Sequence, residues 1–419
     1  MGIRPLKVVE RSSFPIWWWI YRALGKALSP ILHLLPRDSF NEGRLGRFKD
    51  LPQGGIWIHA VSVGEVGAAE SLVEAFLNAG EDKILITVGT RAGWKVAKAR
   101  FQREGLFVAV APFDVAHAVG SFLEQTMPKA ALFVETELWP VMMGSCREKE
   151  IPLFWVNGRV SDRMWATPWP FRGVVGWMIR QFRLRLMRGL EDLDRAKQLA
   201  GDGRGLCLGD LKFDKKLPTT IIDSDDWGPM ERVLVAGSTH EGEEEMILGA
   251  FGRLRKDGDL RLVIAPRQVD RADWVADIAA EFKVVRWSEG CQSDWDVLIV
   301  DEIGVLAGLY RWATIALVGG SWIPRGGHNP LEPASMGIPT LFGPYMDNFR
   351  DVAGELLGHG AARSVDREDL IVALKGWLDH PDEAAQAGRL GPWIVKVRSG
   401  AARRMVSEVL GSVPRLLSE

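Results

Sequence analysis

The chain has 419 residues, 47% of them apolar, which is too long for one ordinary core and predicts two domains. Its net charge is only −2, so a protein that coats nucleic acid is not expected. The three cysteines stand far apart without a CxxC, and the seven histidines show no HxxxH or HExxH spacing. These patterns indicate a reducing compartment and predict neither a disulfide framework nor a metal site.

The N-terminal segment is apolar but interrupted by charge. In residues 16–35, Arg22 and Lys26 share one helical face, while tryptophan and leucine supply the other. Such a helix is a poor bilayer span and a good interfacial helix. Residues 1–49 hold nine basic and three acidic side chains, which anionic headgroups would attract. We therefore predict a membrane-associating segment at residues 1–36; a helix buried against the first domain is the alternative.

The rest of the chain alternates short apolar runs with helical stretches, as in βαβ units. Strand-like runs lie at residues 56–61, 83–88, 106–111, 131–135 and 152–157, and then at 232–238, 261–266, 283–287, 296–301, 315–320 and 339–343. A polar stretch with two prolines separates the two series. The predicted fold class is α/β, with two Rossmann-like, doubly wound domains facing a central cleft, which is the GT-B architecture.

The predicted domains follow from these boundaries. After the N-terminal segment, we expect an acceptor-binding domain at 37–215, a linker at 216–229, a nucleotide-sugar-binding domain at 230–392 and a helical tail at 393–419. Open α/β sheets bind ligands at the carboxyl ends of their strands, so the motifs that follow strands are the candidates for chemistry.

Three motifs of the first domain carry charge. HAVSVGE ends on Glu65, which could act as a general base or merely complement the dipole of the helix that it opens. ETELWP begins at Glu135 and holds two carboxylates, one of which could instead cap the next helix. In GDLKFD, Lys212 could bring positive charge to the cleft or form an ion pair with Asp214 or another acid.

Three motifs of the second domain suit a nucleotide. Ser238 and Glu241 fit a capping box, and the free N–H groups of such a helix start could also hold a phosphate. Arg267 follows a strand and could pair phosphate oxygens or be an ordinary surface residue. The strongest motif spans residues 318–343, where a glycine-rich loop precedes a helix and Glu332 could hold ribose hydroxyls.

These motifs, with the TVGT turn and VNGRVSDR, resemble in identity and order those of the 3-deoxy-D-manno-octulosonic acid (Kdo) transferases. The resemblance covers nearly the whole chain. It implies an inverting, metal-independent glycosyltransferase that moves Kdo from CMP-Kdo to a lipid A precursor, lipid IVA, in lipopolysaccharide synthesis. It implies no cofactor besides this donor, and a place on the cytoplasmic face of the bacterial inner membrane.

The resemblance also implies roles for single residues. Glu65 matches the general base, and Glu135 and Lys212 match positions that stabilise the transition state. The positions that match CMP-binding residues are Pro266, Arg267, Ile303, Gly304, Val305, Asn329, Pro330, Leu331 and Glu332.

The chain departs from the family pattern at two places. Gln268 stands where the family usually has histidine, and Val305 replaces the acid of a Met-Gly-Glu stretch, which leaves donor preference open. Three alternatives therefore remain: a GT-B glycosyltransferase with another activated sugar, a sugar-nucleotide epimerase on the same fold, and a catalytically silent lipid-binding relative.

Overall fold

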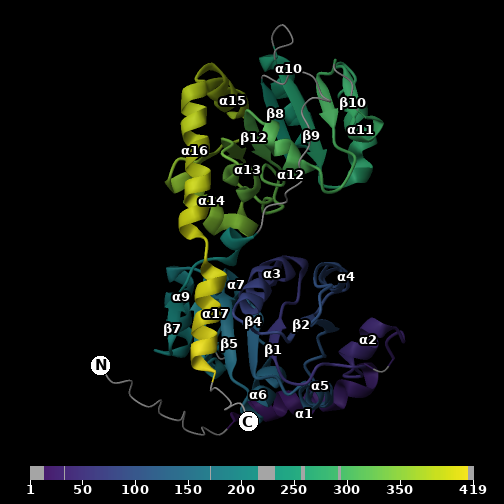
Figure 1. The fold of residues 1–419 in the computed structure, drawn as a ribbon, viewed down its shortest axis with the longest axis vertical. Coiled ribbons are helices and arrows are strands. Elements are labelled where there is room, and N and C mark those ends of the chain that lie inside the picture. Colours follow the sequence, from purple (N-terminus) through teal and green to yellow (C-terminus); the bar gives the residue numbers. More distant parts are fainter. Residues whose placement is uncertain are drawn as a thin grey trace. The chain divides into compact units, whose positions relative to one another are not determined.

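The chain divides into two compact units. The structure, a computed structural model, describes residues 14–32, 34–169, 171–215, 232–255, 260–290 and 294–413 (Figure 1). The first domain comprises Met1–Lys215 and Ser399–Glu419, and the second comprises Lys216–Arg398. The predicted linker at 216–229 lies outside the described residues.

The first domain is built on a parallel sheet with strand order β3-β2-β1-β4-β5-β6-β7 in the described part of the chain. Its strands are β1 Ile56–His59, β2 Ile84–Val88, β3 Leu106–Val110, β4 Ala130–Val134, β5 Leu153–Gly158, β6 Leu184–Met187 and β7 Gly205–Cys207. The longer helices that connect them are α3 Val63–Asn78, α4 Arg91–Arg100, α5 Ala116–Thr126, α6 Pro140–Glu148, α8 Arg172–Gln181 and α9 Leu190–Ala200. The shorter elements are α2 Ser39–Arg44, α7 Asp162–Trp165 and the 3₁₀ turn η1 Leu211–Asp214.

The second domain repeats this design, with strand order β10-β11-β9-β8-β12-β13-β14 among its described residues. Its strands are β8 Val233–Thr239, β9 Arg261–Pro266, β10 Val284–Arg286, β11 Val297–Ile299, β12 Ile315–Val318, β13 Thr340–Phe342 and β14 Ala362–Ser364. Its helices are α10 Glu244–Leu254, α11 Ala272–Ile278, α12 Leu306–Leu309, α13 Leu331–Ser335, α14 Arg350–Gly358, α15 Leu370–Asp379 and α16 Pro381–Arg398. The predicted class of two parallel-sheet α/β domains is confirmed.

Three strands have no counterpart among the predicted apolar runs: β7 and β14, which lie at sheet edges, and β6, which lies next to β7. In β6 the reason is a charged residue within a buried strand. Arg185 is only 3% exposed, and its guanidinium donates to the carbonyl of Gly201 at 2.9 Å. A buried arginine is uncommon without such a partner, so the apolar run that signals a strand is interrupted.

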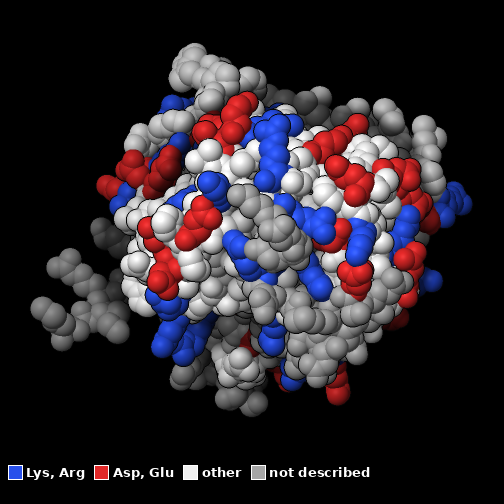
Figure 2. Space-filling model, turned by 90° about the horizontal axis from the view of Figure 1, so that it is seen from above, with Lys and Arg blue, Asp and Glu red and all other residues white. Residues whose placement is uncertain are grey.

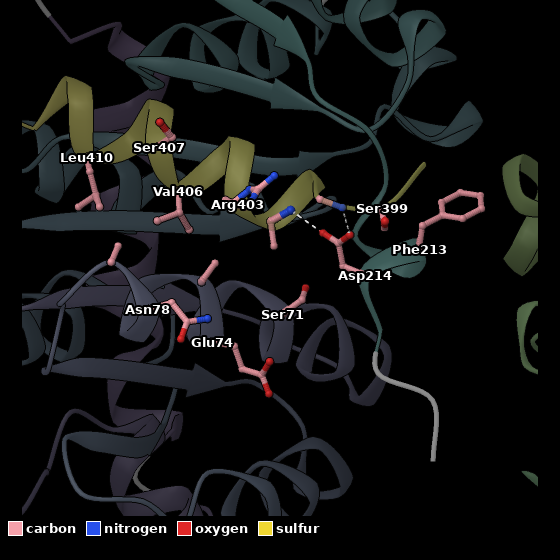
Figure 3. A pocket seen from close by; sticks show the side chains of 14 residues that line it. Ser71, Glu74, Asn78, Phe213, Asp214, Ser399, Arg403, Val406, Ser407 and Leu410 are labelled. Carbon is pink, nitrogen blue, oxygen red and sulfur yellow. Dashed lines mark hydrogen bonds between the residues drawn. The ribbon is translucent and has the colours of Figure 1, made fainter. Parts of the chain in front are cut away.

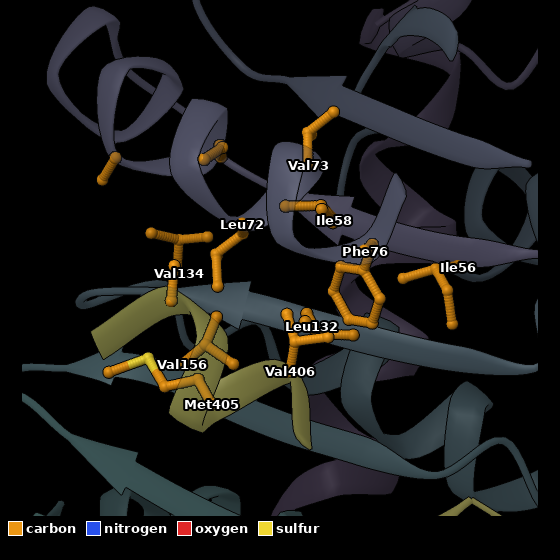
Figure 4. Close-up of a cluster of buried hydrophobic side chains, with 14 of the residues drawn as sticks. Ile56, Ile58, Leu72, Val73, Phe76, Leu132, Val134, Val156, Met405 and Val406 are labelled. Carbon is orange, nitrogen blue, oxygen red and sulfur yellow. The ribbon is translucent and has the colours of Figure 1, made fainter. Parts of the chain in front are cut away.

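The core of the first domain is separated by the sheet into two layers. Along β1, Ile56 and Ile58 point to one face while Trp57 packs on the other, because side chains alternate along a strand. On the first face, α3 contributes Leu72 and Phe76 (Figure 4). The last helix, α17 Ala401–Ser412, lies on the same face and packs against α3.

The chain beyond residue 393 is divided, whereas the sequence predicts one helical tail from 393 to 419. Trp393 lies within α16 of the second domain, and α17 belongs to the first domain. Gly400 separates the two helices with φ 87°, a left-handed conformation that favours glycine. The carboxylate of Asp214 accepts the N–H groups of Gly400 and Ala402, which fixes the start of α17 on the first domain.

Acidic and basic side chains are interspersed on the face of the molecule that Figure 2 presents. This mixture agrees with a chain that holds 52 basic and 54 acidic residues. The face shown therefore presents short-range charge pairs rather than one broad field of a single sign.

The N-terminal helix α1 Ile16–Leu32 is docked on the first domain by one face. Trp18 is 0% exposed, its indole donates to the carbonyl of Pro140 at 3.0 Å, and a Cβ at Gly144 would meet it at 2.5 Å. The hydroxyl of Tyr21 bonds to the carboxylate of Asp114. No helix in the described part of the chain has the length and apolar character that crossing a bilayer requires.

The opposite face of α1 is apolar and exposed. Its exposed side chains are Ile16, Trp19, Ile20, Leu24, Leu28 and Ile31. The alternative of a helix buried against the first domain therefore describes one face of α1, while the other face is exposed to solvent and its membrane contact stays a prediction.

We predict that Trp18 anchors α1, so Trp18→Ala should lower the free energy of unfolding of the first domain by about 3–5 kcal/mol, through lost burial and a cavity. The matched control is Trp19→Ala, because Trp19 is 52% exposed and should cost about 1 kcal/mol or less. Urea unfolding followed by circular dichroism measures both. Equal losses for the two variants would contradict the anchoring role of Trp18.

Candidate functional site

The carboxyl edge of the first sheet brings two predicted site residues to neighbouring strands. β1 pairs in parallel with β4, and the strand order reverses between them, since β2 and β3 lie on one side and β5 to β7 on the other. Glu65 lies in the first turn of the helix after β1, and Glu135 directly follows β4. Such a switch point is where open α/β sheets bind ligands.

Glu65 is held by the start of α3. The N-cap of this helix is Ser62, which accepts the N–H of Glu65 at 3.4 Å. In return the Glu65 carboxylate accepts the Ser62 hydroxyl at 2.9 Å and the N–H of Val61 at 2.7 Å. Glu65 therefore lies in the first turn of α3, where it can complement the helix dipole as the alternative proposes, but the residue is also only 8% exposed.

The surroundings of Glu65 favour its neutral form. Burial, followed by the charges of Glu137 and Glu135, raises the pKa of Glu65 to about 7, although the Val61 N–H opposes this rise. The carboxylate of Glu137 accepts the indole N–H of Trp139 at 2.7 Å, and burial raises its pKa as well. A carboxyl that titrates near neutral pH has the property that a general base needs.

Glu135 lies at a bend in the backbone, with φ 56°. Its carbonyl accepts the indole N–H of Trp155, and its N–H donates to the carbonyl of Val156 at 3.1 Å. Burial raises the pKa of Glu135, and the positive charge of Lys212 acts against this rise. The charge of Glu135 thus acts on Glu65, and the charge of Lys212 acts on Glu135.

Lys212 is placed by the turn η1, where its N–H donates to the carboxylate of Asp210 at 2.9 Å. Asp210 is 5% exposed and lies 3.9 Å from the guanidinium of Arg188. Asp210 and Arg188 both act on Glu135, so the site is a mixed cluster of acids and cations. The other residue of the motif, Asp214, caps α17 instead of pairing with Lys212.

Two details of the sequence analysis need correction in this domain. The helix after ETELWP is not capped by either glutamate, because the carboxylate of Asp114 accepts the N–H groups of Val141 and Met142 at 3.1 and 2.7 Å. Glu137, which the sequence analysis did not select, proves to be a close charge partner of Glu65. The sequence feature that could have identified Glu137 is the second acidic residue of the ETELWP motif.

The carboxyl edge of the second sheet gathers the residues predicted to bind the nucleotide. Ser238 lies near the carboxyl end of β8, and Arg267, the segment 303–305 and the segment 329–332 follow β9, β11 and β12. These four strands are consecutive in the order β11-β9-β8-β12. The order again reverses beside the first strand of the domain, between β8 and β12. The prediction that these segments lie at one edge of a sheet therefore agrees with the topology.

The predicted capping box of Ser238 and Glu241 is wrong. Ser238 lies within β8 at φ 57°, and α10 begins only at Glu244. Glu243 takes the structural role instead: it is 0% exposed, and its carboxylate accepts backbone N–H groups from His240, Gly320, Ser321 and Trp322 at 2.7–3.0 Å. Three of these donors lie more than 70 residues away in the sequence, so no local sequence pattern predicts that Glu243 accepts them.

The loop after β12 combines tight glycines with charge. Gly320 has φ 66°, and a Cβ there would meet the His328 ring at 2.8 Å. His328 in turn contacts His240, with 2.9 Å between their Nε2 atoms. Arg267 and Arg325 are exposed, and their charges act on His240. This edge of the second domain is therefore positively charged, as a phosphate site requires.

The segment 329–332 turns into the short helix α13. The Asn329 side chain accepts the N–H of Leu331 at 3.1 Å and donates to the carboxylate of Glu332 at 3.2 Å. Leu331 is 4% exposed, which leaves its backbone rather than its side chain for a ligand. Among the residues preceding α12, Ile303 is 91% exposed and Gly304 has φ 97°, so this turn is open to solvent.

An open pocket of about 630 Å³ lies elsewhere in the first domain, between α3, η1 and α17 (Figure 3). Ser71, Glu74 and Asn78 line it from α3, and Arg403 and Ser407 line it from α17. None of the predicted site residues lines this pocket. We assign the candidate site by the carboxylates at the switch point, because their charges are perturbed by burial and by one another. Over the ranges that the structure describes, no group of three or more His, Cys, Asp or Glu could hold a metal ion.

Comparison with known proteins defines first the class and then the family. A UDP-GlcNAc 2-epimerase from Neisseria meningitidis, solved with UDP-GlcNAc, matches 86% of this chain and 100% of its own, with a TM-score of 0.59 and 12% identity. This likeness shows the fold alone, which is that of a chain with two parallel-sheet α/β domains. A family model described as 3-deoxy-D-manno-octulosonic-acid transferase matches residues 40–215.

Two curated relatives extend the match. The 3-deoxy-D-manno-octulosonic acid transferase of Bordetella pertussis is 31% identical over 93% of this chain and 94% of that protein. A bifunctional glycosyltransferase/methyltransferase of Fusobacterium nucleatum is 31% identical over 76% of this chain, which spans 52% of the length of that longer protein. The chain belongs to the Kdo transferase family and is a glycosyltransferase.

The raised pKa of Glu65 predicts a pH-dependent effect on stability. Because the folded-state pKa lies near 7 rather than 4.5, protonation stabilises the folded domain, and this contribution is lost as pH rises through 7. Glu65→Gln stays neutral. Its free energy of unfolding, relative to wild type, should therefore rise by up to about 3 kcal/mol between pH 5 and 8.

Urea unfolding at the two pH values measures this difference, and Glu124→Gln, whose side chain is 72% exposed, is the matched control. A difference between Glu65→Gln and wild type that stays constant with pH would show that Glu65 titrates as a solvated acid.

Proposed function

We propose that this protein transfers Kdo from CMP-Kdo to a lipid A precursor, lipid IVA, by an inverting, metal-independent reaction. Membership of the Kdo transferase family supports the class of reaction. The observation that carries the mechanism is the buried Glu65 carboxyl at the switch point of the first sheet, whose pKa of about 7 suits a general base.

In this mechanism Glu65 accepts the proton of a glucosamine hydroxyl of the lipid. The hydroxyl oxygen bonds to C2 of Kdo while the bond from C2 to the phosphate oxygen breaks, and CMP leaves with the electron pair of that bond. A single displacement of this kind inverts the anomeric centre. The hydrogen bonds from Val61 and Ser62 hold the carboxylate in one orientation, which limits the reorganisation needed in the transition state.

The charges around Glu65 have complementary tasks in the proposal. Burial, together with the negative charges of Glu137 and Glu135, keeps the pKa of Glu65 high, and Lys212 partly offsets the charge of Glu135. Glu135 and Lys212 then stabilise charge that develops as the sugar moves between the two oxygens. Preorganised charges of this kind are often the largest single contribution to catalysis.

The donor nucleotide is proposed to bind the second domain. Arg267 and the backbone around Ser238 and Pro266 hold the phosphate, and Glu332 holds the ribose hydroxyls. The turn at Ile303, Gly304 and Val305 and the backbone of Asn329, Pro330 and Leu331 complete the nucleotide site. The positive edge formed by Arg267 and Arg325 supports this assignment. A titration that compares CMP with UDP separates this donor from another activated sugar.

The proposed place of work is the cytoplasmic face of the inner membrane. Support comes from α1, which docks through Trp18 and leaves Leu24 and Leu28 more than half exposed on its opposite face. An amphipathic helix that is docked on its domain by one face can place its other, apolar face in a bilayer interface. The described cysteines Cys146 and Cys207 are free, which fits a reducing compartment.

We predict that Glu65→Gln lowers turnover by about 100-fold or more, because the acceptor proton loses its base. The assay is incubation with CMP-Kdo and lipid IVA, followed by mass analysis of the lipid. CMP binding should be unchanged, and Glu124→Gln should retain wild-type turnover. Undiminished transfer by Glu65→Gln would remove Glu65 from this role, and release of free sugar without a larger lipid would favour an epimerase.

The exposed face of α1 predicts membrane binding. Replacing Leu24 and Leu28 together by aspartate should weaken binding to vesicles of anionic phospholipid by roughly 100-fold, since each buried leucine contributes at least about 1.5 kcal/mol. The control is Val372→Asp, because Val372 is 69% exposed on α15 of the second domain. Vesicle co-sedimentation measures the change, and equal binding by all variants would contradict the proposal.

A further inference from the structure

The two histidines at the switch point of the second domain form a direct pair. His240 follows β8 and His328 follows β12, and these strands are neighbours in the sheet. Their Nε2 atoms are 2.9 Å apart, and their ring planes differ by only 13°. A hydrogen bond between two imidazoles needs one N–H and one lone pair, so one Nε2 carries a proton and the other does not.

Positive charge surrounds this pair. Arg267 and Arg271 approach from the end of β9 and the turn after it, and Arg325 approaches from the loop after β12. Arg271 is paired with the carboxylate of Glu244 at 3.2 Å. The guanidinium groups of Arg267 and Arg325 are exposed and make no hydrogen bond or ion pair to any residue that the structure describes.

The nearby acid does not offset these cations. Glu243, at the start of α10, accepts the His240 N–H, but its carboxylate is also occupied by the backbone of residues 320–322. Burial and the charges of Arg325, Arg267 and Arg271 lower the pKa of His240. Burial, then the charge of His240 and that of Arg267, lowers the pKa of His328 to about 4. The pair is therefore neutral near pH 7 while no anion is bound, and an anion beside the arginines would offset the arginine charges that oppose protonation of the pair.

We propose that the His240–His328 pair takes up one proton when the phosphate of the donor nucleotide binds beside Arg267 and Arg325, so that nucleotide binding strengthens as pH falls. The proton comes from solvent and adds to the Nδ1 of the ring that donates the shared bond. The hydrogen bond between the two Nε2 atoms then persists as a charge-assisted hydrogen bond between an imidazolium and an imidazole. The inference rests on the donor site proposed above and adds two binding groups that the motif analysis did not select.

The proposal also distinguishes substrate from product. The leaving CMP is a phosphate monoester, which carries more negative charge near pH 7 than the phosphodiester of the donor. A more highly charged anion favours the protonated pair more strongly. Release of CMP therefore returns the proton to solvent, and product release becomes easier as pH rises.

Calorimetric titration of the wild-type protein with CMP tests the inference. At pH 7.5, two buffers of different ionisation enthalpy should report uptake of up to one proton per CMP bound. The Kd should rise by up to tenfold per pH unit between pH 6.5 and 8.5, because affinity and protonation are linked reciprocally. Cytidine, which lacks the phosphate, should bind without proton uptake.

The matched variants are His328→Asn, which removes one imidazole but keeps a side chain able to bond to His240, and His380→Asn, an exposed histidine between α15 and α16. Proton uptake should disappear in the first and persist in the second. A wild-type Kd that is constant with pH, without proton uptake, would overturn the inference and leave the nucleotide site intact. Failure of wild-type protein to bind CMP at any pH would overturn the donor site and the inference with it.

Discussion

Both candidate sites depend on one constraint. In each domain, the first strand pairs in parallel with the strand at which the strand order reverses. In the first domain this pair is β1 and β4, and in the second it is β8 and β12. Because parallel strands end at the same edge, residues that follow them meet there, although Glu65 and Glu135 are 70 positions apart in sequence.

The two edges have opposite electrostatic character. In the first domain, buried carboxyls raise one another's pKa, and Lys212 and Arg188 limit that effect on Glu135. In the second domain, arginines lie around a pair of histidines, and burial together with these arginine charges lowers the pKa of His240. The proposed base for a hydroxyl and the proposed phosphate site need these opposite environments, and the two sheets provide them separately.

The helices that begin and end the first domain show how apolar surface is distributed. α17 buries Met405 and Val406 against the sheet, whereas α1 buries Trp18 and leaves its outer face open. An open apolar face on a docked helix is unusual for a protein in free solution, and it is the feature that the proposed membrane contact explains.

The sequence by itself determined the two-domain α/β class, most of the strands and the position of the charged motifs, because buried parallel strands are apolar over short, regular runs. The strand β6 was not predicted, since Arg185 interrupts its apolar run. Only the tertiary structure decided which residues interact. Glu137 acts by its charge on Glu65, Glu243 accepts the backbone N–H groups of residues 320–322, and His240 bonds to His328. Local patterns predict backbone conformation, but a contact between residues that are 70 or more positions apart depends on how the strands are ordered in the sheet.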